Sequence, residues 1–201
     1  MYTKKQLENR RETIVNAAIG CFIDKGFHAT SMRDIAQAAS VSLGNLYNYF
    51  PGKESLIAEV AIQEQDELAP LLDALRDKNT PSRSRVENFL RTYAALCSQR
   101  EWAVLAAECL AEIARNAALA PAFGENHARM LSALEAAIDD GDAQGIFTPR
   151  VPAAIVAQLL LDSVESEAMR RVLMRTPAQS GSEPGEVYAL NSNLLQALLG
   201  I

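Results

Sequence analysis

The stretch SVSLGNLYNYFPGKESL, from Ser40 to Leu56, decides how the chain is interpreted. Before its proline it holds two Tyr, two Asn and one Gly in a segment that allows about two helical turns. The Ser42 hydroxyl can cap such a helix at its start. Pro51-Gly52 ends it, because the residue before a proline is pushed out of the helical region.

This short helix is expected to have two different faces. A rotation of about 100° per residue, with Leu46 at the centre of the inward face, brings Ser42, Tyr49 and Phe50 close to it. Asn can donate to and accept from an adenine edge, Tyr can donate to a phosphate, and Gly lets the backbone approach closely. The outward face therefore suits a DNA groove, or else it is an ordinary polar surface; it carries Gly44, Asn45, Tyr47 and Asn48.

Helical periodicity continues on both sides of this stretch, and no segment alternates apolar and polar residues as a strand would. A first helix is expected over residues 4–25, a short one from the cap at Thr30-Ser31, and a long one from Lys53 with a kink at Pro70. Loops are predicted at 78–85, 139–152 and 175–186. The remaining helices are predicted at 86–98, 101–115, 122–143, 153–175 and 186–199.

Charge is distributed unevenly along the 201 residues, whose net charge is −6. Residues 1–53 hold seven Lys and Arg against four Asp and Glu, whereas the rest holds twelve against twenty-one. A basic end on an acidic protein indicates nucleic acid as the partner of that end. Two short helices joined by a tight turn in this basic segment form a candidate helix-turn-helix.

Other chemistries find little support in the sequence. The three Cys are widely spaced within apolar helical patterns, and the two His are far apart, so neither a disulfide framework nor a metal site is predicted. No cofactor motif is present. No long apolar run or leader-like segment occurs, so we expect a cytoplasmic protein with no membrane partner.

The segments IVNAAIGCFIDKGFHATS (14–31) and SMRDIAQAASVSLGNLYNYFPGKESL (31–56) resemble the DNA-binding signature of the tetracycline-repressor (TetR) family of bacterial regulators. The resemblance covers about residues 10–60, with helix, glycine-aromatic turn and helix-turn-helix in the same order. A later segment, AAIDDGDAQGIFTPRVPAAIVAQLLL (136–161), is similar to the region before the penultimate helix of many members. Family members usually carry Gly in the turn where this chain has Ser40.

The resemblance implies a homodimer that places the helix from Ser42 to Tyr49, Gly44 included, in the major groove of a partly palindromic operator. It implies that Ser31, Arg33, Tyr47 and Lys53 hold phosphates, and that Leu43, Asn45 and Asn48 lie nearest the bases. The physical interpretation agrees for Asn45, Tyr47 and Asn48. For Lys53, a cation at a helix start is out of place electrostatically unless an anion is near.

The resemblance also divides the chain into a three-helix DNA-binding domain, 1–53, and a helical effector-binding and dimerisation domain, 54–201. The nine candidates for effector contact could equally be plain core: Phe89, Tyr93, Cys97, Trp102, Leu105, Cys109, Phe123, His127 and Met130. Glu108 and Glu112, four residues apart, are interpreted as a solvated helix face; buried, they would suit a cationic effector.

The last two helices are implied to form the dimer interface. Apolar stripes support this, because a terminal helix so apolar needs a cover, although packing within one subunit could supply it. The predicted interface residues are Ile155, Leu159, Val187, Leu190, Leu194 and Leu198.

The sequence therefore predicts an all-α, ligand-responsive transcriptional regulator, a repressor released from its operator by a small-molecule effector. An all-α enzyme that uses Glu108, Glu112 or Asp162, or a helical interaction module without an operator, is the alternative. No nucleophile-base pair or phosphate loop supports the enzyme.

Overall fold

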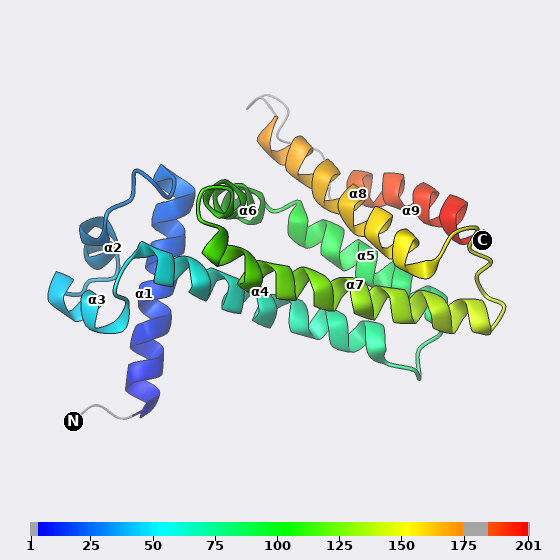
Figure 1. Ribbon diagram of the computed structural model, residues 1–201, viewed down its shortest axis with the longest axis horizontal. Coiled ribbons are helices and arrows are strands. Elements are labelled where there is room, and N and C mark those ends of the chain that lie inside the picture. The colour runs from blue at the N-terminus through cyan, green and yellow to red at the C-terminus, as the bar shows by residue number, and fades with distance from the viewer. Residues whose placement is uncertain (1–3, 175–184, 201) are drawn as a thin grey trace. The chain divides into compact units, whose positions relative to one another are not determined.

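The computed structural model describes residues 4–174 and 185–200, and within these ranges the chain is helical and contains no strand (Figure 1). The all-α prediction is confirmed. None of these helices is both long and apolar enough to cross a membrane. The elements are α1 Lys4–Lys25, α2 Met32–Ala38, α3 Leu43–Tyr49, α4 Lys53–Arg76, α5 Ser82–Cys97, α6 Arg100–Ile113, the 3-10 turn η1 Ala117–Leu119, α7 Ala120–Ala143, α8 Ala153–Leu173 and α9 Gly185–Leu199.

Packing divides the chain into two units that do not follow the sequence in order. Unit 1 comprises the described residues up to Glu64 together with Val104–Gly124, and unit 2 comprises Gln65–Ala103 and the described residues from Glu125 onward. Helices α4, α6 and α7 each contribute residues to both units. The predicted boundary at residue 53 is a division by function and stays a prediction.

Unit 1 is built on the apolar stripe of α1, against which α2 packs, with α3 packed on α2. Phe22 of α1, Ile35 of α2 and Leu46 of α3 are fully buried in one core. Burial of side chains this size stabilises the folded state by about 1.5–3 kcal/mol each. The core also takes in Leu119 of η1, and Phe123 of α7 packs against it.

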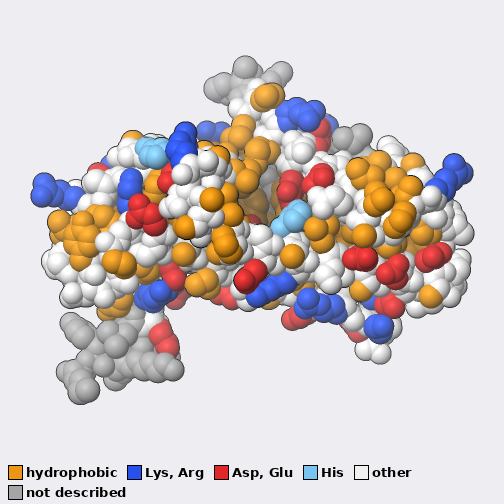
Figure 2. All heavy atoms as spheres, viewed as in Figure 1, with side chains coloured by type: hydrophobic (Ala, Val, Ile, Leu, Met, Phe, Trp, Pro, Cys, Tyr) orange, Lys and Arg blue, Asp and Glu red, His pale blue; other side chains and the backbone are white. Residues whose placement is uncertain are grey.

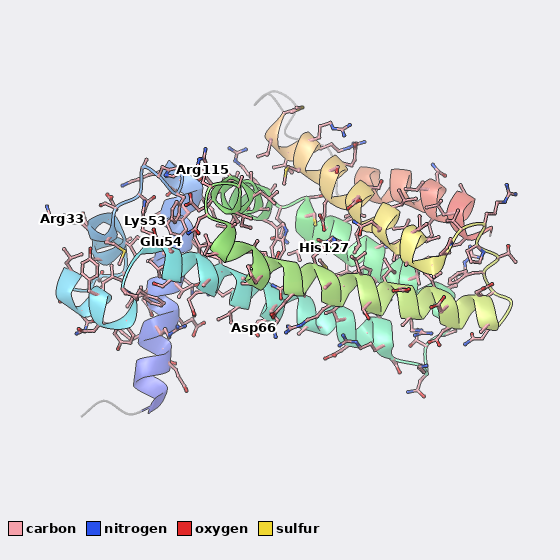
Figure 3. All side chains as sticks on the ribbon, viewed as in Figure 1. Arg33, Lys53, Glu54, Asp66, Arg115 and His127 are labelled. Carbon is pink, nitrogen blue, oxygen red and sulfur yellow. The ribbon has the colours of Figure 1, made fainter. Side chains whose placement is uncertain are left out.

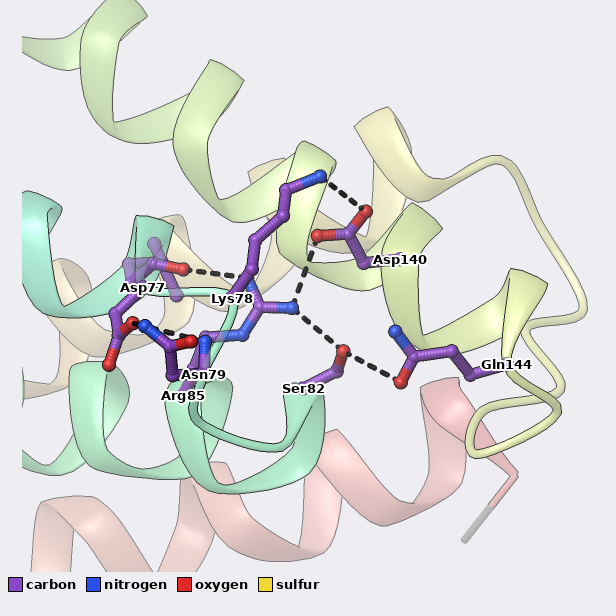
Figure 4. Close-up of polar contacts among 8 residues, drawn as sticks. Asp77, Lys78, Asn79, Ser82, Arg85, Asp140 and Gln144 are labelled. Carbon is purple, nitrogen blue, oxygen red and sulfur yellow. Dashed lines mark hydrogen bonds and ion pairs between the residues drawn. The ribbon is translucent and has the colours of Figure 1, made fainter.

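Unit 2 is a bundle in which α5, α8 and α9 pack on one another around a second apolar core. At one end of this unit the buried guanidinium of Arg85 donates to the Leu75 carbonyl at 3.0 Å, to Ser82 Oγ at 2.8 Å and to Asp140 Oδ2 at 3.1 Å (Figure 4). Hydrogen bonds from Arg85 and Lys78 lower the pKa of Asp140 below its ordinary value. A single side chain thereby joins the end of α4, the start of α5 and the end of α7.

The predicted loop at 78–85 is wrong in its second half, because α5 already begins at Ser82. Pro81 has φ −53° and occupies the N-cap position, where its missing N–H costs nothing. The helix predicted at 122–143 is confirmed at its end, since α7 ends at Ala143, so the overlapping loop predicted from Asp139 begins too early. In both places polar residues that resemble loop composition are held in a helix by the contacts of Arg85.

Ser40, in the turn between α2 and α3, has φ +52° and is the one non-glycine residue with positive φ in the described part of the chain. Its amide donates to the Gln37 carbonyl, and the next amide, of Val41, donates to the Ala36 carbonyl. An L-residue in this left-handed region costs about 1–2 kcal/mol, and Gly does not pay that cost. The turn thus has a left-handed geometry that Gly would adopt without this cost.

We expect Ser40→Gly to raise the free energy of unfolding by about 1 kcal/mol, because it removes the left-handed penalty. Urea unfolding followed by circular dichroism measures the change. Ser132→Gly, at an exposed position in the middle of α7, is the opposite control and should destabilise, since Gly in a helix interior lowers stability. A fall in stability for Ser40→Gly would mean that the turn is not strained.

Candidate nucleic-acid interface

Helix α3 is capped and anchored as its sequence predicts. Ser42 is the N-cap, and its hydroxyl accepts a hydrogen bond from the Asn45 amide at 3.2 Å. Leu46 and Phe50 are buried in the core of unit 1, and Tyr49 packs against that core. Phe50 leaves the helix with φ −136°, in the extended region that a following proline demands. One side of α3 is therefore fixed.

The other side of α3 is open to solvent. Tyr47 is 48% exposed, and Gly44 and Asn48 are also exposed. Asn45 is half-buried, and its side-chain oxygen is enclosed and has no hydrogen-bond partner. Leu43 packs partly against the core. Of the three residues predicted nearest the bases, Asn48 is thus the one whose whole side chain is offered to a groove.

Helix α2 begins at Ser31 with a capping box. The Asp34 amide donates to Ser31 Oγ at 3.1 Å, and the Ser31 amide donates to Asp34 Oδ2 at 2.9 Å. A hydrogen bond from Lys25 and others from Ser31 lower the pKa of Asp34 well below its ordinary value. Arg33 is exposed and points away from α2 (Figure 3). Its guanidinium is placed to meet a phosphate.

Lys53, the first residue of α4, donates to the carbonyl of Phe27 at 2.7 Å. Its ammonium also lies 4.4 Å from the centre of the Phe27 ring. A carbonyl dipole and an aromatic face both stabilise a cation, so the argument that Lys53 needs an anion beside it is wrong. Its contact with phosphate stays a prediction.

The carboxylates of α6 are not the solvated face that the sequence indicated. Glu112 is only 7% exposed, and its Oε2 lies 3.2 Å from His28 Nε2. Glu108 is half-buried and accepts a hydrogen bond from the Phe27 amide at 2.7 Å. The sequence could not indicate these contacts, because Phe27 and Glu108 are 81 residues apart, His28 and Glu112 are similarly distant, and helical periodicity reports only near neighbours.

The nine residues predicted to touch an effector are divided between the two units. Unit 1 holds Leu105, Cys109 and Phe123, and two of these pack against the core under α3. Burial raises the pKa of the Cys109 thiol to about 12, so this group is inert. Unit 2 holds the other six, which are Phe89, Tyr93, Cys97, Trp102, His127 and Met130.

Within unit 2, Tyr93 and His127 meet at Glu165, a residue that was not among the predicted contacts. The Tyr93 hydroxyl donates to Glu165 Oε1 at 2.6 Å, and His127 Nδ1 lies 3.9 Å from the same oxygen. Burial, followed by the charges of Cys97 and Glu165, raises the pKa of Tyr93 well above its ordinary value. The phenol therefore stays protonated and can orient the carboxylate.

Unit 2 also contains an open cavity of about 310 Å³ between α4 and α7. None of the nine predicted effector residues lines it. Its lining combines apolar, amide and charged side chains: Gln65, Leu68, Ala69, Leu72, Asp73, Arg76, Asn126 and Arg129.

Apolar side chains also gather on the surface formed by α8 and α9 (Figure 2). Ile155 is 49% exposed and Leu159 is 44% exposed, one helical turn apart on α8. Leu194 and Leu198 of α9 are partly buried against the core of their own unit. The side chains of Val187 and Leu190 lie outside the described residues.

Comparison with known proteins finds a family model that matches the helix-turn-helix segment. Residues 14–60 match the family model described as bacterial regulatory proteins, tetR family. The chain is 29% identical, over 76% of each protein, to the HTH-type transcriptional regulator UidR of Escherichia coli K12. It is 40% identical to the HTH-type transcriptional repressor KstR2 of Mycolicibacterium smegmatis over 29% of this chain and 28% of that protein.

A solved structure gives the same result for the fold. The transcriptional regulator FadR from Bacillus subtilis, in complex with stearoyl-CoA, is similar with a TM-score of 0.72 and 17% identity. The similarity covers 94% of this chain and 98% of that one. The matched residues 14–60 form the later part of α1, all of α2 and α3, and the start of α4 around one core. Residues 14–60 thus carry the helix-turn-helix segment of the tetR family of bacterial regulatory proteins.

Proposed function

We propose that this protein is a DNA-binding transcriptional regulator that acts as a homodimer and leaves its operator when a small-molecule effector binds. One observation carries the proposal. The exposed face of α3 offers Gly44, Tyr47 and Asn48, while Leu46 and Phe50 hold the helix on the core. A helix fixed on one side and polar on the other is what readout in a major groove requires.

In this mechanism, α3 reads base edges and the surrounding residues fix its register on the duplex. Asn48 would contact a base edge, and Tyr47 and Arg33 would hold phosphates on either side. Ser31 and Ser42 bring a second kind of contact, because each caps a helix whose first amides can face a phosphate. Asn45 would also contact a base edge once its side-chain oxygen turns outward.

A homodimer is proposed because one α3 covers only half of a palindromic site. Two recognition helices must lie about 34–36 Å apart, or a multiple of that, to enter successive major grooves. The exposed apolar side chains of Ile155 and Leu159 support α8 as part of the interface. A pair of apolar residues one turn apart is favourable to bury against a second copy of itself.

Repression and release by an effector are proposed from relatives and from unit 2. KstR2 is a repressor by name, and the FadR structure holds stearoyl-CoA in a chain of the same fold. In this protein Tyr93, His127 and Glu165 bring polar groups together beside the apolar core of unit 2: Tyr93 is buried, and the side chains of His127 and Glu165 are 36% and 37% exposed. An effector that binds better to the form unable to match the groove spacing shifts the population toward it.

The alternatives find no support in the described residues. Of the carboxylates considered for an enzyme, Glu112 is only 7% exposed and lies against His28. Glu108 is already engaged by a backbone amide. We therefore propose a cytoplasmic regulator with no enzymatic activity.

Specific binding to the DNA upstream of its own gene tests the proposal. We expect fluorescence anisotropy to show a dissociation constant of about 10⁻⁸ M or below, and about a thousandfold weaker binding to a scrambled duplex. The affinity should fall linearly on a logarithmic scale as the salt concentration rises, because phosphate contacts release counterions. Equal affinity for both duplexes, together with no motif from random-DNA selection, would favour an interaction module instead.

A further inference from the structure

The turn between α1 and α2 is held from two directions by residues distant in sequence. Gly26, with φ +80°, ends α1, and Phe27 follows it. Lys53 of α4 donates a hydrogen bond to the carbonyl of Phe27 at 2.7 Å, and Glu108 of α6 accepts one from the Phe27 amide at 2.7 Å. The backbone carbonyl and the backbone amide of Phe27 are thus each hydrogen-bonded to a side chain, the first cationic and the second anionic. The position of Phe27 is fixed along its backbone.

The contact with Glu108 is close on all sides. A Cβ placed on Gly26 would lie 3.4 Å from each carboxylate oxygen of Glu108, so the turn passes directly against the carboxylate. One turn further along α6, Glu112 is nearly buried and faces His28. The two carboxylates thus lie against three successive residues of the turn, Gly26, Phe27 and His28. Neither carboxylate is on a solvent-exposed helix face.

This turn determines where the DNA-reading helices lie. It leads directly into the capping box at Ser31, and Thr30 donates its hydroxyl back to the Cys21 and Gly26 carbonyls at 3.1 and 2.8 Å. From Ser31 the chain enters α2, on which α3 packs. A shift of the turn therefore moves α2 and α3 as a pair.

We infer that Glu108 is a positioning residue for DNA recognition, which acts by accepting the Phe27 amide and so fixing the turn that carries α2 and α3. The inference rests on the proposed function. Glu108, which lies outside the matched 14–60 segment, thereby sets the position of the recognition helix. Glu112 lies against the same turn, with its Oε2 3.2 Å from His28 Nε2.

Three variants of the full-length protein separate this role from a general loss of fold. Glu108→Ala removes the acceptor, whereas Glu108→Gln keeps an oxygen that can accept from the Phe27 amide. Glu101→Ala is the matched control, because Glu101 lies on the same helix and is exposed. Helix content and subunit mass are measured for each variant, and binding is assayed well below its thermal midpoint.

Hydrogen exchange of the Phe27 amide reports the contact without any DNA. We expect Glu108→Ala to speed this exchange about tenfold or more, because the donor loses its partner, while the amide of Leu46 inside α3 is unchanged. Glu108→Gln and Glu101→Ala should exchange at the wild-type rate. Unchanged exchange at Phe27 in Glu108→Ala would overturn the inference.

Operator titration reports the consequence of the contact. We expect Glu108→Ala to bind the wild-type operator about tenfold more weakly, with Glu108→Gln restored to within about twofold. Fast exchange at Phe27 with unchanged operator affinity would also overturn the inference. Failure of the wild-type chain to bind any operator would instead count against the proposed function, and the exchange measurement would still decide whether Glu108 holds the turn.

Discussion

Replacing Tyr47 and Asn48 together by alanine is expected to lower the affinity for the operator by about 100-fold or more, with the fold intact. Both side chains are exposed on α3, so their removal leaves no cavity and exposes no core. A good base contact contributes roughly 1–3 kcal/mol, and a dimer loses its contacts in both half-sites. Fluorescence anisotropy with the operator measures the change.

The matched control for this pair is Arg83→Ala with Glu87→Ala. These two residues form an ion pair on α5, 2.9 Å apart, with Arg83 exposed and Glu87 partly exposed, so the control also removes two surface side chains and leaves the net charge unchanged. It should bind the operator as the wild type does. If the Tyr47 and Asn48 double variant keeps wild-type affinity, α3 is not the recognition helix.

Introducing charge on α8 is expected to separate the proposed dimer into monomers. Ile155→Glu with Leu159→Glu places four carboxylates in a symmetric interface, where unpaired charges are costly to bury. The dissociation constant of the dimer should rise by about 100-fold or more, and specific operator binding should be lost because two half-sites no longer bind as one unit. Analytical ultracentrifugation at micromolar concentration measures the mass.

Ile62→Glu is the control for the α8 variant. Ile62 is 50% exposed, as open as Ile155, but it lies on α4 in unit 1. It should leave the mass of the assembly unchanged, which separates an effect of the interface from an effect of added charge. A dimeric Ile155 and Leu159 variant would exclude this part of α8 from the interface.

The local features of unit 1 could be predicted from the sequence. The caps at Ser31 and Ser42, the inward Leu46 and the stop before Pro51 each depend on residues within four positions of one another. Such short-range patterns are what capping and periodicity report. The unusual backbone of Ser40 could be suspected for the same reason, because a tight turn leaves few conformations.

The contacts that hold these features in place could not be predicted in this way. Phe27 meets Glu108 across 81 residues, and Lys53 reaches Phe27 across 26. An i, i+4 pair of Glu on a helix has the same pattern whether it faces water or a partner, so the sequence favoured water for Glu108 and Glu112. The start of α5 at Ser82 was missed because its polar residues are held by the buried Arg85 rather than by an apolar stripe.

The core of unit 1 is assembled from segments on both sides of a long insertion. This limits where the DNA-binding segment can be joined to the regulatory half of another protein. A chimera that joins this DNA-reading segment to another regulatory half at residue 53 would discard Leu119 and Phe123, which close the core. It would also discard the carboxylate that accepts the Phe27 amide. The segment that must be transferred is therefore larger than the matched family segment. It comprises the described residues up to Glu64 and Val104–Gly124, and a chimera has to include both.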